Sequence, residues 1–140
     1  MTRLVLDASV AVKLFFEEEH SGAAERCVQG ASELLAPDLI WVETANVIRK
    51  RQRRGDISKE QAAAIAGHLL GLPLHIHPSA DLIPDALELA MQFDRTVYDA
   101  LYLALAVKSG CPMVSGDKRL ANALAKTPLR EHIAWIGELG

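Results

Sequence analysis

The sequence predicts an α/β fold, with a three-layer α/β/α arrangement around a central, mainly parallel sheet of about five strands. Short apolar segments that are typical of buried strands alternate with longer segments of helical pattern. Parallel strands need long crossover connections, and the helices that provide them cover both faces of the sheet. At 140 residues, of which 50% are hydrophobic, the chain has the size and apolar content of one domain, 1–140.

The first part of the chain is predicted to contain two strands and four helices. Gly30, Gly55 and Gly71 each follow a helical segment, and glycine is favoured where a helix ends. Ser58 and Gln61 have the spacing of a capping box, which indicates a helix start. In chain order we expect a strand at 3–7, helices at 8–16 and 21–29, a strand at 34–36, and helices at 38–54 and 58–71.

The second part is predicted to contain three strands and three helices. Segment 96–109 is almost wholly apolar, which is typical of a buried helix, and Gly110 stops it. Pro84 is tolerable in a helix that begins at residue 81 because it falls in the first turn. In chain order we expect a strand at 73–77, helices at 81–92 and 96–109, a strand at 111–114, a helix at 118–125 and a strand at 132–136.

Four acidic residues lie in places where carboxylates are uncommon. Asp7 ends the first apolar strand and Asp117 follows the fourth, so both belong to the sheet edge where ligand crevices of α/β folds lie. Glu43 interrupts the apolar face of the helix at 38–54, and Asp99 is the one acid of the apolar helix. Carboxylates gathered at an apolar edge repel one another unless a cation joins them, so the pattern indicates a metal site.

Each of these acids also has a structural interpretation. Asp7 fits an N-cap, Asp99 fits the third position of a capping motif, and Asp117 fits a Ser-Gly-Asp turn. Glu43 could form a tertiary salt bridge, although no Lys or Arg lies three or four residues away on its helix. Asn46, one turn further on, could instead orient Glu43 through a hydrogen bond. The joint occurrence of the four acids favours the metal interpretation.

The chemistry that fits these carboxylates is that of Mg²⁺ or Mn²⁺. Both cations prefer carboxylate and water oxygens, and Mg²⁺ takes further oxygens from phosphate groups. Such ions orient a water molecule, lower its pKa and stabilise the leaving oxygen of an in-line displacement at phosphorus. The sequence contains neither a P-loop nor a G-x-G-x-x-G motif, so it gives no support to a nucleotide-cofactor function.

A basic run lies at the end of the helix predicted at 38–54. It begins six residues after Glu43, and its charges could bind RNA phosphates without reading the base sequence. The alternative is a solvated helix terminus, where cations suit the helix dipole. The possible phosphate contacts are Arg49, Lys50, Arg51, Arg53 and Arg54.

Four segments of the chain, in order and with matching spacing, resemble the PIN domain and in particular the VapC-type toxin nuclease of VapBC toxin–antitoxin pairs. These segments are 6–10, 42–47, 98–106 and 114–120. The resemblance implies a parallel sheet of about five strands between helices and a Mg²⁺- or Mn²⁺-dependent endoribonuclease. It also implies a cognate antitoxin as partner and a homodimer. Ser115 stands where the family often has Thr, so the hydroxyl is retained.

The resemblance also implies roles for individual residues. Three of the acids would hold the principal ion, the fourth would reach it through water or bind a second ion, and water would be the nucleophile. The catalytic and metal-binding acids would be Asp7, Glu43, Asp99 and Asp117. The residues expected to orient these ligands are Ser9, Asn46 and Ser115.

Other functions remain open from the sequence. A structure-specific DNA nuclease or a phosphatase could use the same acids, although aspartyl-phosphate phosphatases usually need Asp-x-Asp where this chain has Ser9 in the third position. A catalytically silent PIN-like binding module is the other alternative. Cys27 and Cys111 lack paired spacing, which fits reduced thiols in a cytoplasmic protein, and no segment is predicted to enter a membrane.

Overall fold

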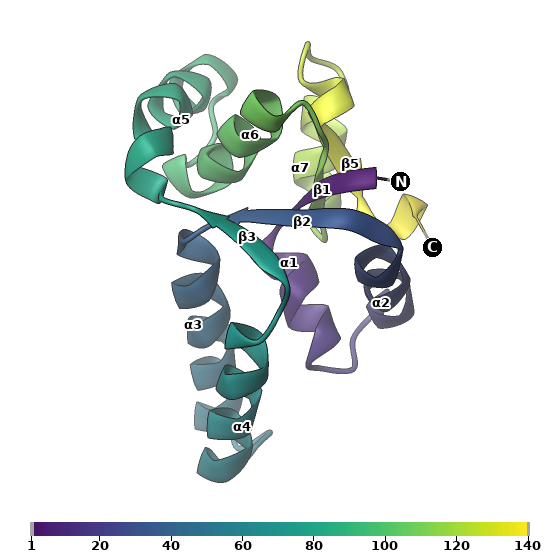
Figure 1. Ribbon diagram of the computed structural model, residues 1–140, viewed down its shortest axis with the longest axis vertical. Coiled ribbons are helices and arrows are strands. Elements are labelled where there is room, and N and C mark those ends of the chain that lie inside the picture. The colour runs from purple at the N-terminus through teal and green to yellow at the C-terminus, as the bar shows by residue number, and fades with distance from the viewer. Residues whose placement is uncertain (1, 140) are drawn as a thin grey trace.

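Five strands form one sheet in the order β3-β2-β1-β4-β5, and every neighbouring pair is parallel (Figure 1). This computed structural model describes residues 2–139. The predicted parallel sheet is confirmed, and its central strand is β1, with β2 on one side and β4 on the other. The strands are β1 (Thr2–Leu6), β2 (Ala31–Pro37), β3 (Leu74–His77), β4 (Met113–Ser115) and β5 (Ile133–Trp135).

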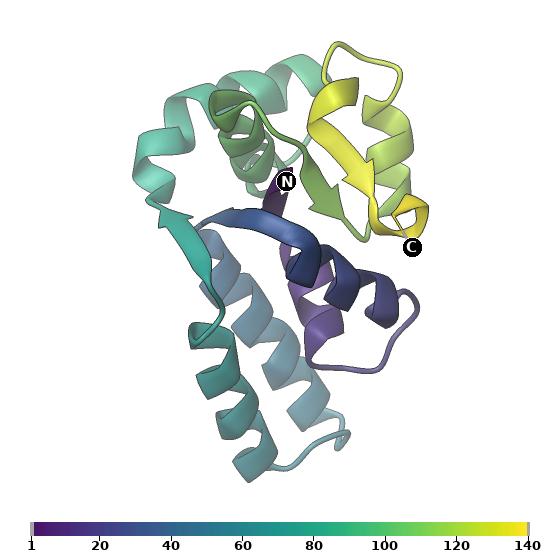
Figure 2. The same ribbon diagram turned by 45° about the vertical axis from the view of Figure 1, so that its right-hand side comes forward.

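Helices connect the strands and cover both faces, as the predicted three-layer arrangement requires. The helices are α1 (Ala8–Ala11), α2 (Ser21–Gly30), α3 (Leu39–Arg53), α4 (Lys59–Leu70), α5 (Ser79–Phe93), α6 (Val97–Ser109) and α7 (Lys118–Leu124). Helices α5 and α6 lie on one face of the sheet, and α1, α2 and α3 lie on the other (Figures 1 and 2). Helix α4 folds back along α3 as a hairpin that extends beyond the sheet (Figure 2). None of the described helices has both the length and the apolar content needed to cross a bilayer.

Helix α6 is buried on nearly all sides. Its residues 100–106 are all buried, because the helix packs on β1, β2 and β4 and is also in contact with α5. Thr96 caps its start, where the Thr96 hydroxyl accepts a hydrogen bond from the backbone N–H of Asp99 at 3.1 Å. Gly110 ends the helix in the left-handed conformation, with φ at 66°. The predicted apolar helix thus holds Asp99 at the edge of the core.

The helix expected at 8–16 is interrupted in the structure. Helix α1 ends at Ala11 and is followed by a 3₁₀ turn, Val12–Leu14, after which the chain leaves helical geometry. The reason is tertiary packing: Phe16 turns away to join Ile48 and Leu69 in a second apolar cluster at the base of the α3–α4 hairpin. The core therefore fixes the position of α3 relative to α1.

The prediction that Pro84 falls in the first turn of its helix was wrong. Helix α5 begins at Ser79, so Pro84 lies inside it and cannot donate to the carbonyl of Ala80. Both residues are exposed, so water can satisfy that carbonyl. The earlier start is supported by Asp38, whose Oδ1 accepts a hydrogen bond from the Ser79 backbone N–H at 3.0 Å.

All five strands differ from their predicted bounds by one to three residues, and the difference is largest at the start of β2. Strand β2 begins at Ala31, three residues earlier than expected, directly after the last residue of α2. The last strand is shorter than predicted, because short 3₁₀ helices, Arg130–His132 and Ile136–Glu138, flank it. Neither difference moves the sheet edge at which β1 and β4 end.

Candidate metal centre

The four predicted acids meet at one cavity beyond the carboxyl ends of β1 and β4. Asp7 directly follows β1, Asp117 is the N-cap of α7, Glu43 lies on α3, and Asp99 lies in the first turn of α6. The cavity has a volume of about 360 Å³. Its lining residues are Asp7, Ala8, Ser9, Val12, Glu43, Asn46, Val47, Lys50, Asp99 and Asp117.

Asp7 is the most deeply buried of the four acids, with only 9% of its surface exposed. Its Oδ2 accepts two hydrogen bonds, from the Ser9 hydroxyl at 2.7 Å and from the Ser115 hydroxyl at 2.9 Å. The other carboxylate oxygen, Oδ1, accepts no hydrogen bond from the described residues and remains accessible from the cavity. Burial raises the pKa of Asp7 to about 6, with the serine hydrogen bonds opposing the shift and the charges of Glu43 and Asp99 adding to it.

Each of these serines makes a second hydrogen bond, to the loop between β4 and α7. The Ser9 hydroxyl accepts from the Gly116 backbone N–H at 2.8 Å, and the Ser115 hydroxyl accepts from the Asp117 backbone N–H at 3.0 Å. A Cβ on Gly116 would lie 3.2 Å from the Ser9 hydroxyl oxygen, so a larger residue would press on this contact. The loops after β1 and β4 are therefore locked together around Asp7.

Glu43 is half-buried, and its partner comes from the other helical layer. The Tyr102 hydroxyl of α6 donates to Glu43 Oε1 at 2.6 Å. Burial raises the pKa of Glu43, the bond from Tyr102 lowers it, and the charge of Asp99 raises it further. The predicted hydrogen bond from Asn46 does not form within residues 2–139, although Asn46 does line the cavity.

Tyr102 is the residue that the sequence reasoning missed. It is 1% exposed, and burial raises the pKa of its hydroxyl far above the ordinary value, so the group stays a donor. A signal was present, because a tyrosine inside an apolar helix needs a partner for its hydroxyl. The sequence did not show which acid that partner would be.

Asp99 and Asp117 complete the acidic side of the cavity. Burial raises the pKa of Asp99, the charge of Asp117 raises it further, and Arg95 and the Thr96 hydrogen bond lower it. Asp117 uses its Oδ1 to cap α7, where it accepts from the Leu120 backbone N–H at 3.1 Å. Within the described part of the chain, no Lys or Arg forms an ion pair with any of the four acids.

These features fit a hard divalent cation that keeps several water ligands. A buried carboxylate without a cationic partner needs a proton or a metal, and Asp7 still offers one oxygen to the cavity. In residues 2–139 no three carboxylate, thiol or imidazole groups converge closely enough to enclose an ion by themselves. Mg²⁺ is commonly held by one or two carboxylates with the remaining positions filled by water and phosphate, so the donor set suits it.

The five predicted basic residues do not share one environment. Arg51 forms an ion pair with Glu18 and lies over the ring of Phe16, 4.6 Å from its centroid, so it is not available for phosphate. Arg49 donates to Gln52 at 2.8 Å and does not line the cavity. The other three line a second hollow of about 300 Å³ next to the acids: Lys50, Arg53 and Arg54.

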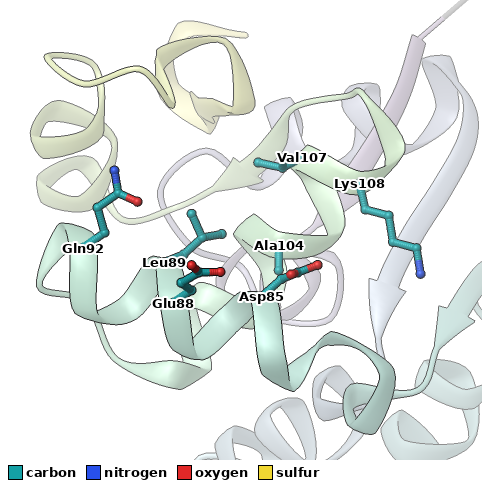
Figure 3. Close-up of a pocket in the computed structure, with 7 residues that line it drawn as sticks. All are labelled: Asp85, Glu88, Leu89, Gln92, Ala104, Val107 and Lys108. Carbon is teal, nitrogen blue, oxygen red and sulfur yellow. The ribbon is translucent and has the colours of Figure 1, made fainter.

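A separate cavity, which none of the predicted acids lines, lies between α5 and α6 (Figure 3). It has a volume of about 340 Å³ and an apolar floor that includes Leu89 and Val107. Asp85 and Glu88 of α5 line it together with Lys108 of α6 (Figure 3). It contains none of the predicted site residues, so the acidic cavity is the candidate centre.

Comparisons with known proteins show the family to which the chain is related. Residues 4–125 match the PIN domain family model. The chain is 40% identical over 121 residues to Ribonuclease VapC3 of Pyrobaculum aerophilum, covering 85% of this chain and 92% of that protein. It is 34% identical over 125 residues to Ribonuclease VapC1 of Mycobacterium tuberculosis, covering 88% of this chain and 92% of that protein.

Solved structures share the fold. PAE2754 from Pyrobaculum aerophilum has a TM-score of 0.73 at 22% identity, covering 99% of this chain and 86% of that chain. VapC20 of Mycobacterium tuberculosis, described as a toxin that cleaves the sarcin-ricin loop, has a TM-score of 0.66 at 21% identity, covering 86% and 94%. A toxin–antitoxin complex from Klebsiella pneumoniae has a TM-score of 0.66 at 14% identity, covering 94% and 95%.

The raised pKa of Asp7 predicts that the metal-free protein becomes less stable as the pH rises. In the unfolded chain this carboxyl ionises near pH 3.8, whereas in the folded protein it keeps its proton up to about pH 6. Between these values only the folded state binds the proton, so the free energy of unfolding falls with rising pH, by about 3 kcal/mol in total. Urea unfolding in EDTA between pH 4 and pH 7.5 measures this fall.

The matched variant is Asp7→Asn, which keeps the shape of the side chain and an acceptor for both serines. We expect it to lack this component of the pH dependence and to be more stable than the wild type at pH 7.5 without metal. An identical pH dependence in the two proteins would contradict the burial of an ionisable Asp7.

The bond from Tyr102 to Glu43 predicts a stability loss in Tyr102→Phe. The variant removes the hydroxyl donor, so that only water can donate a hydrogen bond to the Glu43 carboxylate. We therefore expect the free energy of unfolding at pH 7.5 to fall by about 1–2 kcal/mol. The control is Tyr98→Phe on the same helix, where the side chain is exposed, and a change within about 0.5 kcal/mol is expected. Equal effects of the two variants in urea unfolding would count against the bond.

Proposed function

The chain belongs to the PIN domain family, and from this membership and its acidic cavity we propose that it is a metal-dependent endoribonuclease, the toxin of a toxin–antitoxin pair. The observation that carries the proposal is that carboxylates from four separate elements converge on one cavity without a Lys or Arg ion-pair partner among the described residues. Support comes from the relatives at 40% and 34% identity, both of which are named ribonucleases.

Three of the acids, Asp7, Glu43 and Asp99, would hold the principal Mg²⁺ or Mn²⁺, in part through bound water, because no three carboxylates of the described residues converge closely enough to enclose an ion by themselves. Asp117 would reach this ion through water or hold a second one, since one of its oxygens already caps α7. When bound, the ion would lower the pKa of a water molecule and stabilise the leaving oxygen at phosphorus. Water supplied in this way is the proposed nucleophile, because none of the described cysteines or histidines lines the cavity and the Ser9 hydroxyl is used to hold Asp7.

The chain's own groups keep these ligands oriented and ionised. Ser9 and Ser115 hold one oxygen of Asp7 and leave the other free for the ion. A pKa of about 6 leaves the Asp7 carboxyl largely ionised at neutral pH, and metal binding would lower that pKa further. Tyr102 donates to Glu43 and so favours its charged form.

The proposed macromolecular partners are an RNA substrate and a cognate antitoxin, both met in the cytoplasm. We also propose a homodimer, supported by an exposed apolar stripe on α5. Ile83, Leu87 and Met91 recur every four residues and are 47%, 47% and 70% exposed. Contiguous exposed apolar surface on a helix is typical of a protein interface.

The test of function is cleavage of single-stranded RNA in Mn²⁺ by the wild type and by Asp99→Asn. We expect Asp99→Asn to lose at least about a hundredfold in rate, because a carboxylate ligand is replaced by a neutral amide. Asp85→Asn, an exposed acid on α5, is the matched control and should cleave at the wild-type rate. Cleavage at the wild-type rate by a folded Asp99→Asn variant would contradict the role of Asp99 as a metal ligand.

A parallel assay with DNA of the same sequence separates the alternatives. Cleavage of DNA alone would favour a DNA nuclease. A wild type that cleaves neither polymer, and whose melting temperature does not respond to Mn²⁺, would favour a silent binding module.

The dimer is tested by sedimentation of Leu87→Glu. A charge in the centre of the stripe should convert a wild-type dimer to a monomer, because the acid cannot be buried against apolar side chains. Leu70→Glu is the control, since Leu70 is 67% exposed on α4 and lies outside the stripe. A wild type that sediments as a monomer, or equal effects of the two variants, would contradict the assignment.

A further inference from the structure

The acidic cavity has a basic end. Lys50 lines it together with the four acids, and Lys50 also lines the adjacent hollow with Arg53 and Arg54. Lys50 is the one residue shared by the two hollows. The acidic cavity and the group of cations at the end of α3 are therefore adjacent, with Lys50 between them.

The acidic cavity lies between α3 and α1, with Asp99 and Asp117 completing its lining, whereas the second hollow is lined by the end of α3 alone. Glu43, Asn46, Val47 and Lys50 follow one another at helical spacing on one face of α3, and α1 with its 3₁₀ extension forms the opposite wall. Lys50 is seven residues beyond Glu43, which is about 10 Å along the helix axis. The Lys50 backbone therefore lies beyond Glu43 in the direction of Arg53 and the end of the helix.

The charges at the basic end are free to bind an anion. Within residues 2–139, neither Lys50 nor Arg53 forms an ion pair, and both are exposed. Arg54 has one exposed partner, Asp56, at 2.7 Å. Arg51, by contrast, is held by Glu18. The basic run thus contains two cations that are available for a ligand, Lys50 and Arg53, and one, Arg51, that ties α3 to Glu18.

We propose that Lys50 and Arg53 bind the backbone phosphates next to the scissile phosphate, so that a single RNA strand lies along α3 from the acids toward the end of the helix. This inference rests on the proposed ribonuclease function. Cations of this kind position a strand without reading its bases, since they contact phosphate alone.

The test measures binding separately from cleavage. A fluorescent single-stranded RNA is titrated with full-length protein in EDTA, and its anisotropy is followed over a range of salt concentrations. We expect Lys50→Ala to raise Kd roughly three- to fivefold at low salt and to make the slope of log K against log salt shallower by about 0.7, the value for one phosphate contact on a single strand. Lys50→Arg should restore both quantities.

The matched control is Lys108→Ala, which removes the same side chain from an exposed helical position in the cavity of Figure 3. It should leave Kd within about 1.5-fold of the wild type, as expected for a distant charge screened by salt. Arg49→Ala tests whether the run acts only as diffuse charge. If Arg49→Ala or Lys108→Ala weakens binding as much as Lys50→Ala does, the proposed contact is wrong.

A second measurement places the contact on the RNA. After the wild-type cleavage position is mapped in Mn²⁺, single phosphates on either side are replaced by neutral methylphosphonates. We expect one neighbouring replacement to weaken binding of the wild type but not of Lys50→Ala, since the two changes remove the same pair. Wild-type protein that does not cleave RNA, but whose RNA binding in the anisotropy titration is weakened by Lys50→Ala, would refute the nuclease and keep the phosphate site. Cleavage of RNA by the wild type, together with equal RNA binding by the wild type and Lys50→Ala, would refute the phosphate site and keep the nuclease.

Discussion

The buried carboxylate of Asp7 is the constraint around which the site is organised. It lies where the central strand passes into α1, and two serine hydroxyls, from α1 and from the end of β4, donate to the same oxygen. Those serines in turn accept backbone N–H groups of the loop before α7, so the strand ends cannot move independently. The two serine hydrogen bonds stabilise the charged form of Asp7, but burial destabilises that form by more. The pKa of Asp7 therefore remains raised. The fold therefore keeps a group that only a proton or a cation satisfies.

The remaining acids approach this carboxylate from both helical layers. Glu43 comes from α3 on one face of the sheet, and Tyr102, which donates to it, comes from α6 on the other (Figure 1). This hydrogen bond links α3 and α6, and so joins the two helical layers beside the end of the central strand. Mutual repulsion of the acids is tolerated because the buried residues of α6 and the sheet supply the apolar stabilisation that the site lacks. In α6 the buried residues 100–106 follow directly after Asp99, so the apolar core begins next to the acidic site.

The sequence allowed the sheet, the order of its elements and the meeting of Asp7 with Asp117 to be predicted, because parallel strands end at a common edge. It placed Glu43 on an apolar face, but helical periodicity says nothing of a partner from another layer, so Tyr102 was missed. The same limit applies to Arg51, which belongs to a run of cations in the sequence but is held by Glu18 and Phe16 in the fold. The break after α1 could not be predicted either, since the burial of Phe16 against the α3–α4 hairpin is a long-range contact.

The spacing of charges along α3 suits the proposed roles of Glu43 and Lys50, because it keeps these two side chains from pairing with each other. A lysine three or four residues after Glu43 would be its neighbour on the helix and would form an ion pair with it. Such a pair would neutralise a ligand that the ion needs and would remove a cation that the phosphate needs. Those two positions hold Asn46 and Val47, which carry no charge, and the first available cation comes a full turn later at Lys50. One helix can therefore present a cation-binding end and an anion-binding end because the residues between them pair with neither.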